Sequence, residues 1–244
     1  MPEPDERKAA EAPRLNTTGL KLPGRDPFAA ARARMVRDQL ARRGIRDRRV
    51  LAAMELLPRH LFVPEAERAL AYADGALPIG HGQTISQPFI VAEMLEALAL
   101  KGDERVLEVG AGSGYAAALL GLLAREVVAI ERIPELAARA AAVIADLGLP
   151  NVEIRCGDGT KGAPDRAPFD AILVSAGGRH LPGALVAQLA PGGRLVIPLG
   201  DPLGGQRLMR FVKDPATGRL DEEYLDAVRF VPLVTEETGN GGAG

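Results

Sequence analysis

Between residues 103 and 199 the chain alternates short apolar runs with longer segments whose apolar residues recur at helical spacing. The apolar runs have the length and aliphatic content of buried strands, and the segments between them are long enough to form crossover helices. This alternation predicts an α/β fold with a doubly wound, mostly parallel sheet. Strands are expected near residues 105–109, 126–131, 152–156, 170–175 and 194–199.

Three helices are predicted around these strands. Residues 29–43 and 49–57 carry apolar side chains at helical spacing, so two short helices are expected before the sheet. A third helix is expected over residues 134–147, because Pro134 opens that stretch, Gly148 follows it, and neither residue type interrupts it.

The C-terminal part of the pattern predicts two more strands, at residues 207–212 and 224–231. The sequence between them, at 214–218, is rich in residues that favour a turn. An antiparallel strand pair is therefore expected to close one edge of the sheet.

The two ends of the chain lack the periodicity of a core. Residues 1–27 are rich in proline and charged residues, and residues 236–244 are rich in glycine. Both are expected to form flexible tails outside the core, the first of them disordered. Residues 28–235 are then expected to form a single domain.

Composition narrows the classes of function. Hydrophobic residues make up 47% of the 244 residues, and the formal net charge is −2, so there is no basic excess for binding nucleic acid. No apolar run approaches the ~20 residues of a membrane span, and the N-terminus has no apolar signal region. We expect a cytoplasmic protein with no nucleic-acid or membrane partner.

Cysteine and histidine usage gives no sign of a metal site. Cys156 is the only cysteine, which excludes an internal disulfide and the cysteine-rich zinc patterns. His60, His81 and His180 have no metal-ligand spacing, so each is expected to lie at the surface or to make a local hydrogen bond. No metal is predicted.

The most informative chemistry lies in residues 106–115, VLEVGAGSGY, where a predicted strand opens into a glycine-rich turn and then a helix. Gly110, Gly112 and Gly114 allow the backbone to approach a ligand closely. The dinucleotide pattern G-x-G-x-x-G would place a glycine at Tyr115, and Glu108 lies too close to the turn to favour a pyrophosphate. S-adenosylmethionine, which carries sulfonium and amino groups, suits this turn better than NAD.

Glu131 supports a nucleoside cofactor. It ends the predicted strand at 126–131 and lies 21 residues after Gly110, close to the ~20 at which such folds place a carboxylate on ribose hydroxyls. The alternative is a turn that only packs a strand against a helix, with Glu131 in solvent.

With these motifs placed, residues 30–234 resemble the protein-L-isoaspartate O-methyltransferases, a family of S-adenosylmethionine-dependent repair enzymes. The most specific blocks are 76–80, ALPIG, and 82–88, GQTISQP, which most other methyltransferases of this fold lack. Further matching blocks lie at 106–110, 157–159, 167–172, 195–198 and 228–233. The resemblance implies a Rossmann-like class I methyltransferase sheet with an N-terminal helical segment and a C-terminal antiparallel strand pair.

The resemblance also implies roles for individual residues. Ser86 is expected at the reaction centre, and residues 228–233 beside the substrate cleft. The expected cofactor contacts are Gln83, Thr84, Ile85, Ser86, Gly110, Gly112, Ser113, Glu131, Asp158 and Gly159. The implied reaction is methyl transfer to the α-carboxylate of L-isoaspartyl residues in damaged proteins or peptides, whose methyl ester then closes to a succinimide.

Local pattern alone gives two of these residues different roles. Ser86 precedes Pro88 and an apolar helical run, which is typical of a helix cap. Asp158 lies between two glycines at a strand end, where an Asx-turn is common. A binding role is favoured for Asp158 because ligands gather at the carboxyl ends of strands in such sheets.

Two loops depart from the family pattern. Residues 175–180, SAGGRH, replace a segment usually richer in alanine and proline. They add Arg179, which is expected to face solvent rather than a carboxylate substrate. The loop at 201–205 offers no cation to a carboxylate.

Three other functions are less consistent with the sequence. A methyltransferase of the same fold with a different acceptor rests only on the altered loop at 177–180. A cofactor-binding module without turnover conflicts with the retention of Ser86 beside an intact turn. An NAD-dependent oxidoreductase conflicts with Tyr115 and Glu108.

Overall fold

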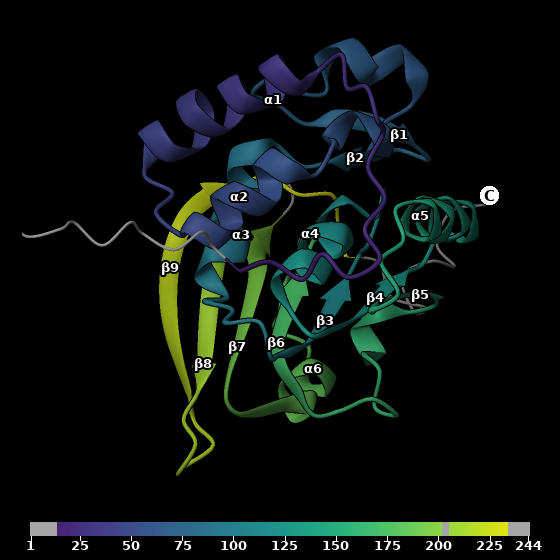
Figure 1. The fold of residues 1–244 in the computed structure, drawn as a ribbon. Helices are drawn as coiled ribbons and strands as arrows, with labels where there is room; N and C mark the ends of the chain where they lie inside the picture. The colour runs from purple at the N-terminus through teal and green to yellow at the C-terminus, as the bar shows by residue number, and fades with distance from the viewer. Residues whose placement is uncertain (1–13, 202–204, 234–244) are drawn as a thin grey trace, which may run out of the picture.

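The computed structural model describes residues 14–201 and 205–233, and Figure 1 shows them as a ribbon built around one large sheet. Seven strands form this sheet in the order β5-β4-β3-β6-β7-β8-β9. Their bounds are β3 Arg105–Val109, β4 Glu126–Glu131, β5 Val152–Cys156, β6 Phe169–Val174, β7 Leu189–Asp201, β8 Gly205–Lys213 and β9 Leu220–Val228.

The first five of these strands pair in parallel, and β8 and β9 pair antiparallel at one edge. The doubly wound sheet and its antiparallel edge are therefore confirmed (Figure 1). The chain order runs outward from β3 in both directions, toward β5 on one side and β7 on the other. Such a reversal of order creates a crevice at the carboxyl ends of the strands, here after Val109.

Successive apolar side chains of the parallel strands point to opposite faces of the sheet, so both faces of the sheet are buried. In β3, Val106 belongs to the apolar cluster on one face, whereas Leu107 and Val109 belong to the cluster on the other. In β4, Val127 and Val128 divide in the same way. Strands covered on both faces read as continuous apolar runs, which is the pattern that predicted them.

Helices cover both faces. Their bounds are α1 Ala29–Arg34, α2 Arg48–Leu56, α3 Pro88–Ala97, α4 Tyr115–Leu123, α5 Pro134–Asp146 and α6 Gly183–Gln188. The α1 helix continues through a π-helical segment, Met35–Leu40, and a 3₁₀ turn, Ala41–Arg43, so the predicted helix at 29–43 is present with irregular hydrogen bonding. The predicted helices at 49–57 and 134–147 match α2 and α5 within a residue.

Two predictions from the sequence are wrong: the residue at which the last strand ends, and the disorder of residues 14–27. The last strand ends at Val228 rather than 231, because the chain then turns to meet the loop after β6, where the Gly177 N–H donates to Val231 O at 2.8 Å. Residues 14–27, expected in a disordered tail, belong to the folded part. Leu15 and Leu20 pack against the core, and the Lys21 N–H donates to Leu147 O at 2.8 Å.

The remaining expectations about the termini fall on residues 1–13 and 234–244, which lie outside the described residues. Within the described part of the chain, no helix combines the length and apolar character needed to cross a membrane.

A two-stranded hairpin that the apolar pattern did not predict lies above the sheet (Figure 1). It pairs β1, Leu77–Gly80, with β2, Gln83–Ile85. His81 and Gly82 connect the strands with φ of 54° and 69°, the positive values that a tight two-residue hairpin turn requires. The hairpin brings the block at 82–88 to the carboxyl end of β3, where it shares pockets with Gly110 and Gly112.

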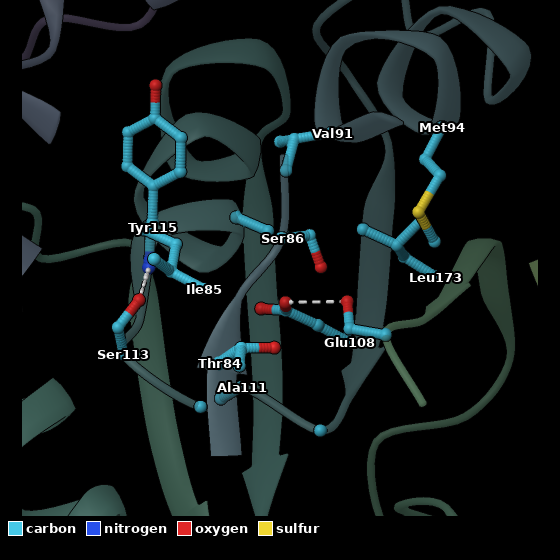
Figure 2. A pocket seen from close by; sticks show the side chains of 14 residues that line it. Thr84, Ile85, Ser86, Val91, Met94, Glu108, Ala111, Ser113, Tyr115 and Leu173 are labelled. Carbon is cyan, nitrogen blue, oxygen red and sulfur yellow. Dashed lines mark hydrogen bonds between the residues drawn. The ribbon is translucent and has the colours of Figure 1, made fainter. Parts of the chain in front are cut away.

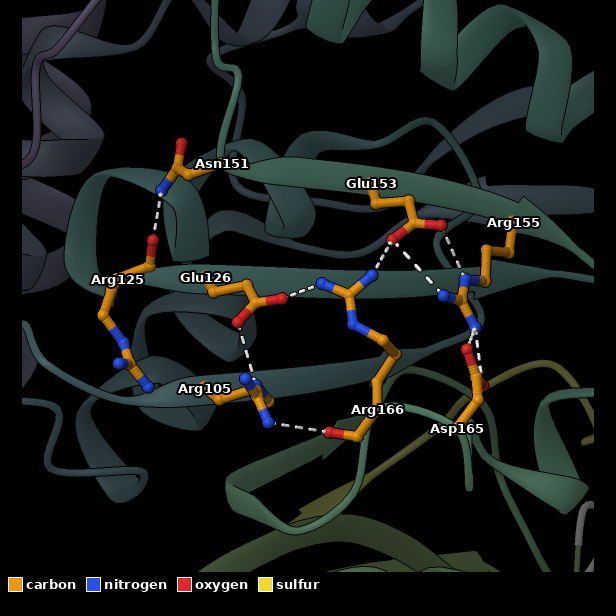
Figure 3. Close-up of polar contacts among 8 residues, drawn as sticks. All are labelled: Arg105, Arg125, Glu126, Asn151, Glu153, Arg155, Asp165 and Arg166. Atoms are coloured by element: carbon orange, nitrogen blue, oxygen red, sulfur yellow. Dashed lines mark hydrogen bonds and ion pairs between the residues drawn. The ribbon is translucent and has the colours of Figure 1, made fainter.

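A network of ion pairs joins the side chains of three neighbouring strands and the loop before β6 (Figure 3). Glu126 pairs with both Arg105 and Arg166, and Arg166 also pairs with Glu153 at 2.6 Å. Arg105 and Glu126 are the first residues of β3 and β4, so this part of the network lies at the end of the sheet opposite the crevice.

Candidate active site

The glycine-rich turn after β3 has the backbone geometry that its sequence indicates. Gly110, Gly112 and Gly114 have φ of 84°, 55° and 84°, in the left-handed region that disfavours other residues. Gly114 is the N-cap of α4, and the Tyr115 N–H donates to Ser113 Oγ at 3.4 Å. The chain thus passes directly from the buried strand to the helix, with its main chain lining the crevice.

Glu131 reaches back to this turn. Its Oε2 accepts a hydrogen bond from the Gly112 N–H at 2.7 Å, and its Oε1 accepts one from the Ile133 N–H at 2.9 Å. The side chain is 6% exposed and lines a pocket of about 190 Å³ together with Gly110 and Gly159. The carboxylate is therefore fixed by main-chain donors at the pocket wall, and the solvated alternative for Glu131 is wrong.

The hairpin and α3 present Ser86 to the crevice. Gln87, not Ser86, is the N-cap of α3, and no side chain caps that helix. The interpretation of Ser86 as a cap is therefore wrong, because Ser86 lies one residue before the capping position. Figure 2 shows the Ser86 hydroxyl turned toward the Glu108 carboxylate across a narrow pocket of about 40 Å³.

Three pockets meet at this point. The narrow pocket, the 190 Å³ pocket beside Glu131, and a third of about 330 Å³ are all lined by Thr84 and Ser175. Ser86 lines the narrow pocket and the third one. We name the pocket beside Glu131 the cofactor pocket because six of the predicted cofactor contacts line it, and the 330 Å³ pocket the acceptor pocket because Ser86 and part of the block expected beside the substrate cleft line it. A ligand in each would meet at the narrow pocket between them.

The narrow pocket contains a buried carboxyl group. Glu108 is 1% exposed; its Oε1 accepts a hydrogen bond from Ser175 Oγ at 3.2 Å, whereas its Oε2 has no partner among the described residues. The pKa of Glu108 is raised to about 8: burial raises it most, the Ser175 hydrogen bond lowers it, and the nearby Glu131 carboxylate raises it. An unpaired acceptor of this kind suits a cationic or hydrogen-bond-donating ligand group.

The predicted cofactor residues do not all have the same position. Gln83, Thr84, Gly110, Gly112, Glu131 and Gly159 line the cofactor pocket, whereas Ile85, Ser86 and Ser113 line the narrow pocket and not the cofactor pocket. Asp158 lines neither. Its Oδ1 accepts hydrogen bonds from the Thr160 N–H and hydroxyl at 2.9 and 2.7 Å, the Asx-turn expected from local pattern. Its cofactor role stays a prediction.

The segment after β9 forms one wall of both outer pockets. Val228, Arg229 and Phe230 line the acceptor pocket, while Pro232 and Leu233 line the cofactor pocket. This places the block at 228–233 beside the cleft, as the resemblance implied.

The sequence did not indicate what holds that segment in place. Buried Gln206 accepts from the Phe230 N–H at 2.6 Å and donates to Phe230 O at 3.3 Å. Ser175, which lines all three pockets, was also missed, because nothing local to the altered loop marks it. Arg179 in the same loop is exposed, as expected, and residues 202–204 of the loop at 201–205 lie outside the described range.

The described residues contain no group of three or more His, Cys, Asp or Glu side chains that would hold a metal ion. Their donor set instead fits S-adenosylmethionine. The left-handed glycine turn gives close access to main chain, the orphaned Glu108 oxygen suits a cation, and Glu131 suits hydroxyl groups. A doubly wound sheet with this turn and this acid defines a Rossmann-like, S-adenosylmethionine-dependent methyltransferase.

Comparison with known proteins identifies the family. The family model described as protein-L-isoaspartate(D-aspartate) O-methyltransferase (PCMT) matches residues 31–238. A protein-L-isoaspartate O-methyltransferase 1 of Rhodopseudomonas palustris is 58% identical over 210 residues, covering 86% of this chain and 85% of the relative. A protein-L-isoaspartate O-methyltransferase of Methylorubrum extorquens is 57% identical over 206 residues, covering 84% and 89%.

Solved structures agree. One protein-L-isoaspartate O-methyltransferase has a TM-score of 0.77 at 29% identity, over 86% of this chain and 67% of that one. A Plasmodium falciparum protein described as a putative protein-L-isoaspartate O-methyltransferase, in complex with S-adenosyl-L-homocysteine, has a TM-score of 0.72 at 28% identity, over 83% and 98%. The chain belongs to the protein-L-isoaspartate O-methyltransferase family. It is an enzyme that transfers a methyl group from S-adenosylmethionine to L-isoaspartyl residues of damaged proteins.

Proposed function

We propose that this methyl transfer takes place beside Ser86, with the cofactor in the pocket of Glu131 and the isoaspartyl peptide in the acceptor pocket. The observation that carries the proposal is the junction of the three pockets at Thr84 and Ser175, with Ser86 on the wall of the narrow one. When bound, the cofactor supplies an electrophilic methyl group on a sulfonium. The residues around the junction need only bring an acceptor oxygen to it in line.

The acceptor needs no strong base. An α-carboxylate has a pKa near ~3.5 and is already ionised at neutral pH. The Ser86 hydroxyl donates a hydrogen bond to one of its oxygens and leaves the other to react. Rate enhancement then comes mainly from proximity and alignment, and from closing water out of a narrow pocket.

The cofactor residues divide by chemistry. Glu131, already held by two main-chain donors, accepts from ribose hydroxyls. Glu108 turns its unpaired oxygen toward the cofactor, and a cationic group there would favour loss of the proton that burial keeps on this carboxyl. The segment 83–86 and the turn at Gly110–Gly114 enclose it, and Asp158 and Gly159 lie on the adenine side.

The residues that line the acceptor pocket bear on which proteins the enzyme can methylate. An isoaspartyl site arises in many sequences, so the enzyme must recognise mainly the peptide main chain around it. Residues 227–231 line the acceptor pocket, and a peptide held there by its main chain would be bound whatever its side chains. We propose a broad substrate range, with no nucleic-acid or membrane partner. Cytoplasmic location stays a prediction from the sequence.

The decisive experiment measures transfer of labelled methyl from S-adenosylmethionine to a synthetic isoaspartyl peptide and to its aspartyl twin. Transfer only to the isoaspartyl peptide, and its loss in Ser86→Ala with cofactor binding intact, would support this assignment. Undiminished turnover in Ser86→Ala would remove Ser86 from the mechanism. Similar rates across peptides of unrelated flanking sequence would support the broad range, and strict dependence on one flanking residue would contradict it.

A further inference from the structure

One buried cation near the junction of the pockets has no part in the mechanism described above. Arg59 lies in η3, a 3₁₀ turn at Arg59–Phe62, and its side chain is 0% exposed. It forms no ion pair with any carboxylate in the described part of the chain. Burying an unpaired guanidinium is costly, so its presence calls for a specific use.

The hydrogen bonds of Arg59 point to that use. Nη2 donates to the main-chain oxygen of Ser86 at 2.7 Å, and Nε donates to Ala71 O at 2.9 Å. The guanidinium also lies over the ring of Tyr115, 5.0 Å from its centroid. Ser86 and Tyr115 both line the narrow pocket. A single buried side chain is thus bonded to one pocket residue and stacked on another.

The local structure of Ser86 explains why it needs such support. The residue lies between the end of β2 and the start of α3, so neither the strand nor the helix fixes its main chain by regular hydrogen bonds. Its hydroxyl takes no part in capping the helix. Arg59 holds the main chain at Ser86 by a hydrogen bond, and its rigid planar guanidinium donates to carbonyl groups of two different segments at once.

We propose that Arg59 is a positioning residue for methyl transfer: by holding the main-chain oxygen of Ser86, it sets where the Ser86 hydroxyl meets the acceptor carboxylate. The inference rests on the proposed role of Ser86. Lysine cannot replace the fork, because one ammonium on a flexible stem cannot hold both carbonyls with the same geometry. A displacement of the Ser86 hydroxyl by a fraction of the pocket width lowers kcat, and it removes no group that contacts the cofactor.

The test is a double-mutant cycle of Arg59→Met and Ser86→Ala, assayed with an isoaspartyl peptide. We expect Arg59→Met to lower kcat roughly 10- to 100-fold in the parent enzyme, with cofactor Kd unchanged, and to have almost no further effect in the Ser86→Ala background. Arg59→Lys should give an intermediate kcat. An equal loss of kcat in both backgrounds, or no loss in the parent, would overturn the proposal.

Two further measurements keep the result interpretable. Arg49→Met is the matched control, because Arg49 also donates to main-chain oxygens of different segments, Leu100 O at 2.6 Å and Leu123 O at 2.8 Å, and neither of these residues lines the three pockets. It should lower the melting temperature without the selective loss of kcat. If Arg59→Met does not fold, Arg59→Lys replaces it in the cycle. An unaltered kcat in Ser86→Ala alone would instead indicate failure of the Ser86 assignment.

Discussion

The Gly112 N–H donates to Glu131 Oε2 over 2.7 Å, so the carboxylate that ends β4 is bonded to the turn that ends β3. Both oxygens of Glu131 accept main-chain hydrogen bonds, which orients the group before any ligand enters. Each oxygen retains a second lone pair for a hydroxyl donor. The bond thus connects the glycine-rich turn to the predicted ribose acceptor.

Replacing Glu131 should weaken cofactor binding. We expect Glu131→Ala to lower the affinity for S-adenosylmethionine by roughly 1–3 kcal/mol, since it removes the ribose acceptor and frees the Gly112 N–H. Glu131→Gln, which keeps one acceptor oxygen, should lose less. Calorimetric titration measures both. Full affinity in Glu131→Ala would refute the ribose assignment.

Removing the Ser86 hydroxyl should affect turnover rather than cofactor binding. The side chain lines the acceptor and narrow pockets but not the cofactor pocket. Ser86→Ala therefore lowers kcat for the isoaspartyl peptide, by roughly 10-fold or more, with the cofactor Kd nearly unchanged. Thr217→Ala, which removes a hydroxyl that lines none of the three pockets, is the control that should retain activity.

The sheet and most helices were predictable because their signals are local. Parallel strands buried on both faces are continuous apolar runs, and the helix at Pro134–Asp146 begins with proline and ends near glycine. The hairpin at Leu77–Ile85 was not predictable from periodicity. Its strands contain four and three residues, too few to establish a period, and its turn relies on positive φ at His81 as well as at Gly82.

The site was predictable only in part, for a related reason. Glu131 could be identified from its spacing along the sequence from Gly110. The role of Ser86 came from the family resemblance. Arg59 and Gln206 act on residues 27 and 24 positions away through side-chain contacts that no local pattern records. Residues 14–27 were misjudged because a few apolar contacts and main-chain bonds suffice to hold a segment rich in polar residues.

Glu108 should make stability fall as pH rises. Burial raises its pKa from 4.5 to about 8 in the native protein. Between these values the native chain holds a proton that the unfolded chain has lost, so the free energy of unfolding decreases with pH by up to ~1.4 kcal/mol per unit. Below 4.5 this contribution is fully present, and above about 8 it is lost.

Glu108→Gln should remove that dependence. Denaturant titrations across the window from pH 4.5 to about 8 would show the variant gaining stability relative to the parent as pH rises. Burial also raises the pKa of Glu93, to about 7, but this group is unchanged in both proteins, so the difference between them isolates Glu108. A constant difference across the window would contradict a raised pKa at Glu108.

The ion-pair network at the end of the sheet opposite the pockets should contribute to stability and not to activity (Figure 3). Arg166→Met breaks the pairs with Glu126 and Glu153 and should lower the free energy of unfolding by about 1 kcal/mol, less at high salt. Arg42→Met removes one exposed pair, with Asp38, and should cost a few tenths of a kcal/mol at most. A loss that did not change with salt would exclude an ion-pair origin.

Gln206 should hold in place the segment after β9 that lines the acceptor pocket. Its amide makes two hydrogen bonds with the Phe230 main chain, so Gln206→Ala leaves both groups of Phe230 unpaired and frees the segment that lines the acceptor pocket. We expect roughly 1–3 kcal/mol of lost stability and a higher KM for the isoaspartyl peptide, with the cofactor Kd less affected.

A second buried glutamine separates this local effect from general destabilisation. Gln188 holds the main chain at Ala163 and Lys161 with two bonds of 2.8 Å and lines none of the three pockets. Gln188→Ala should therefore cost a similar stability while leaving the peptide KM unchanged. If both variants raised that KM equally, the change at Gln206 would reflect lost stability alone. A selective rise in Gln206→Ala would mean that the segment after β9 must be held in place for the peptide to bind.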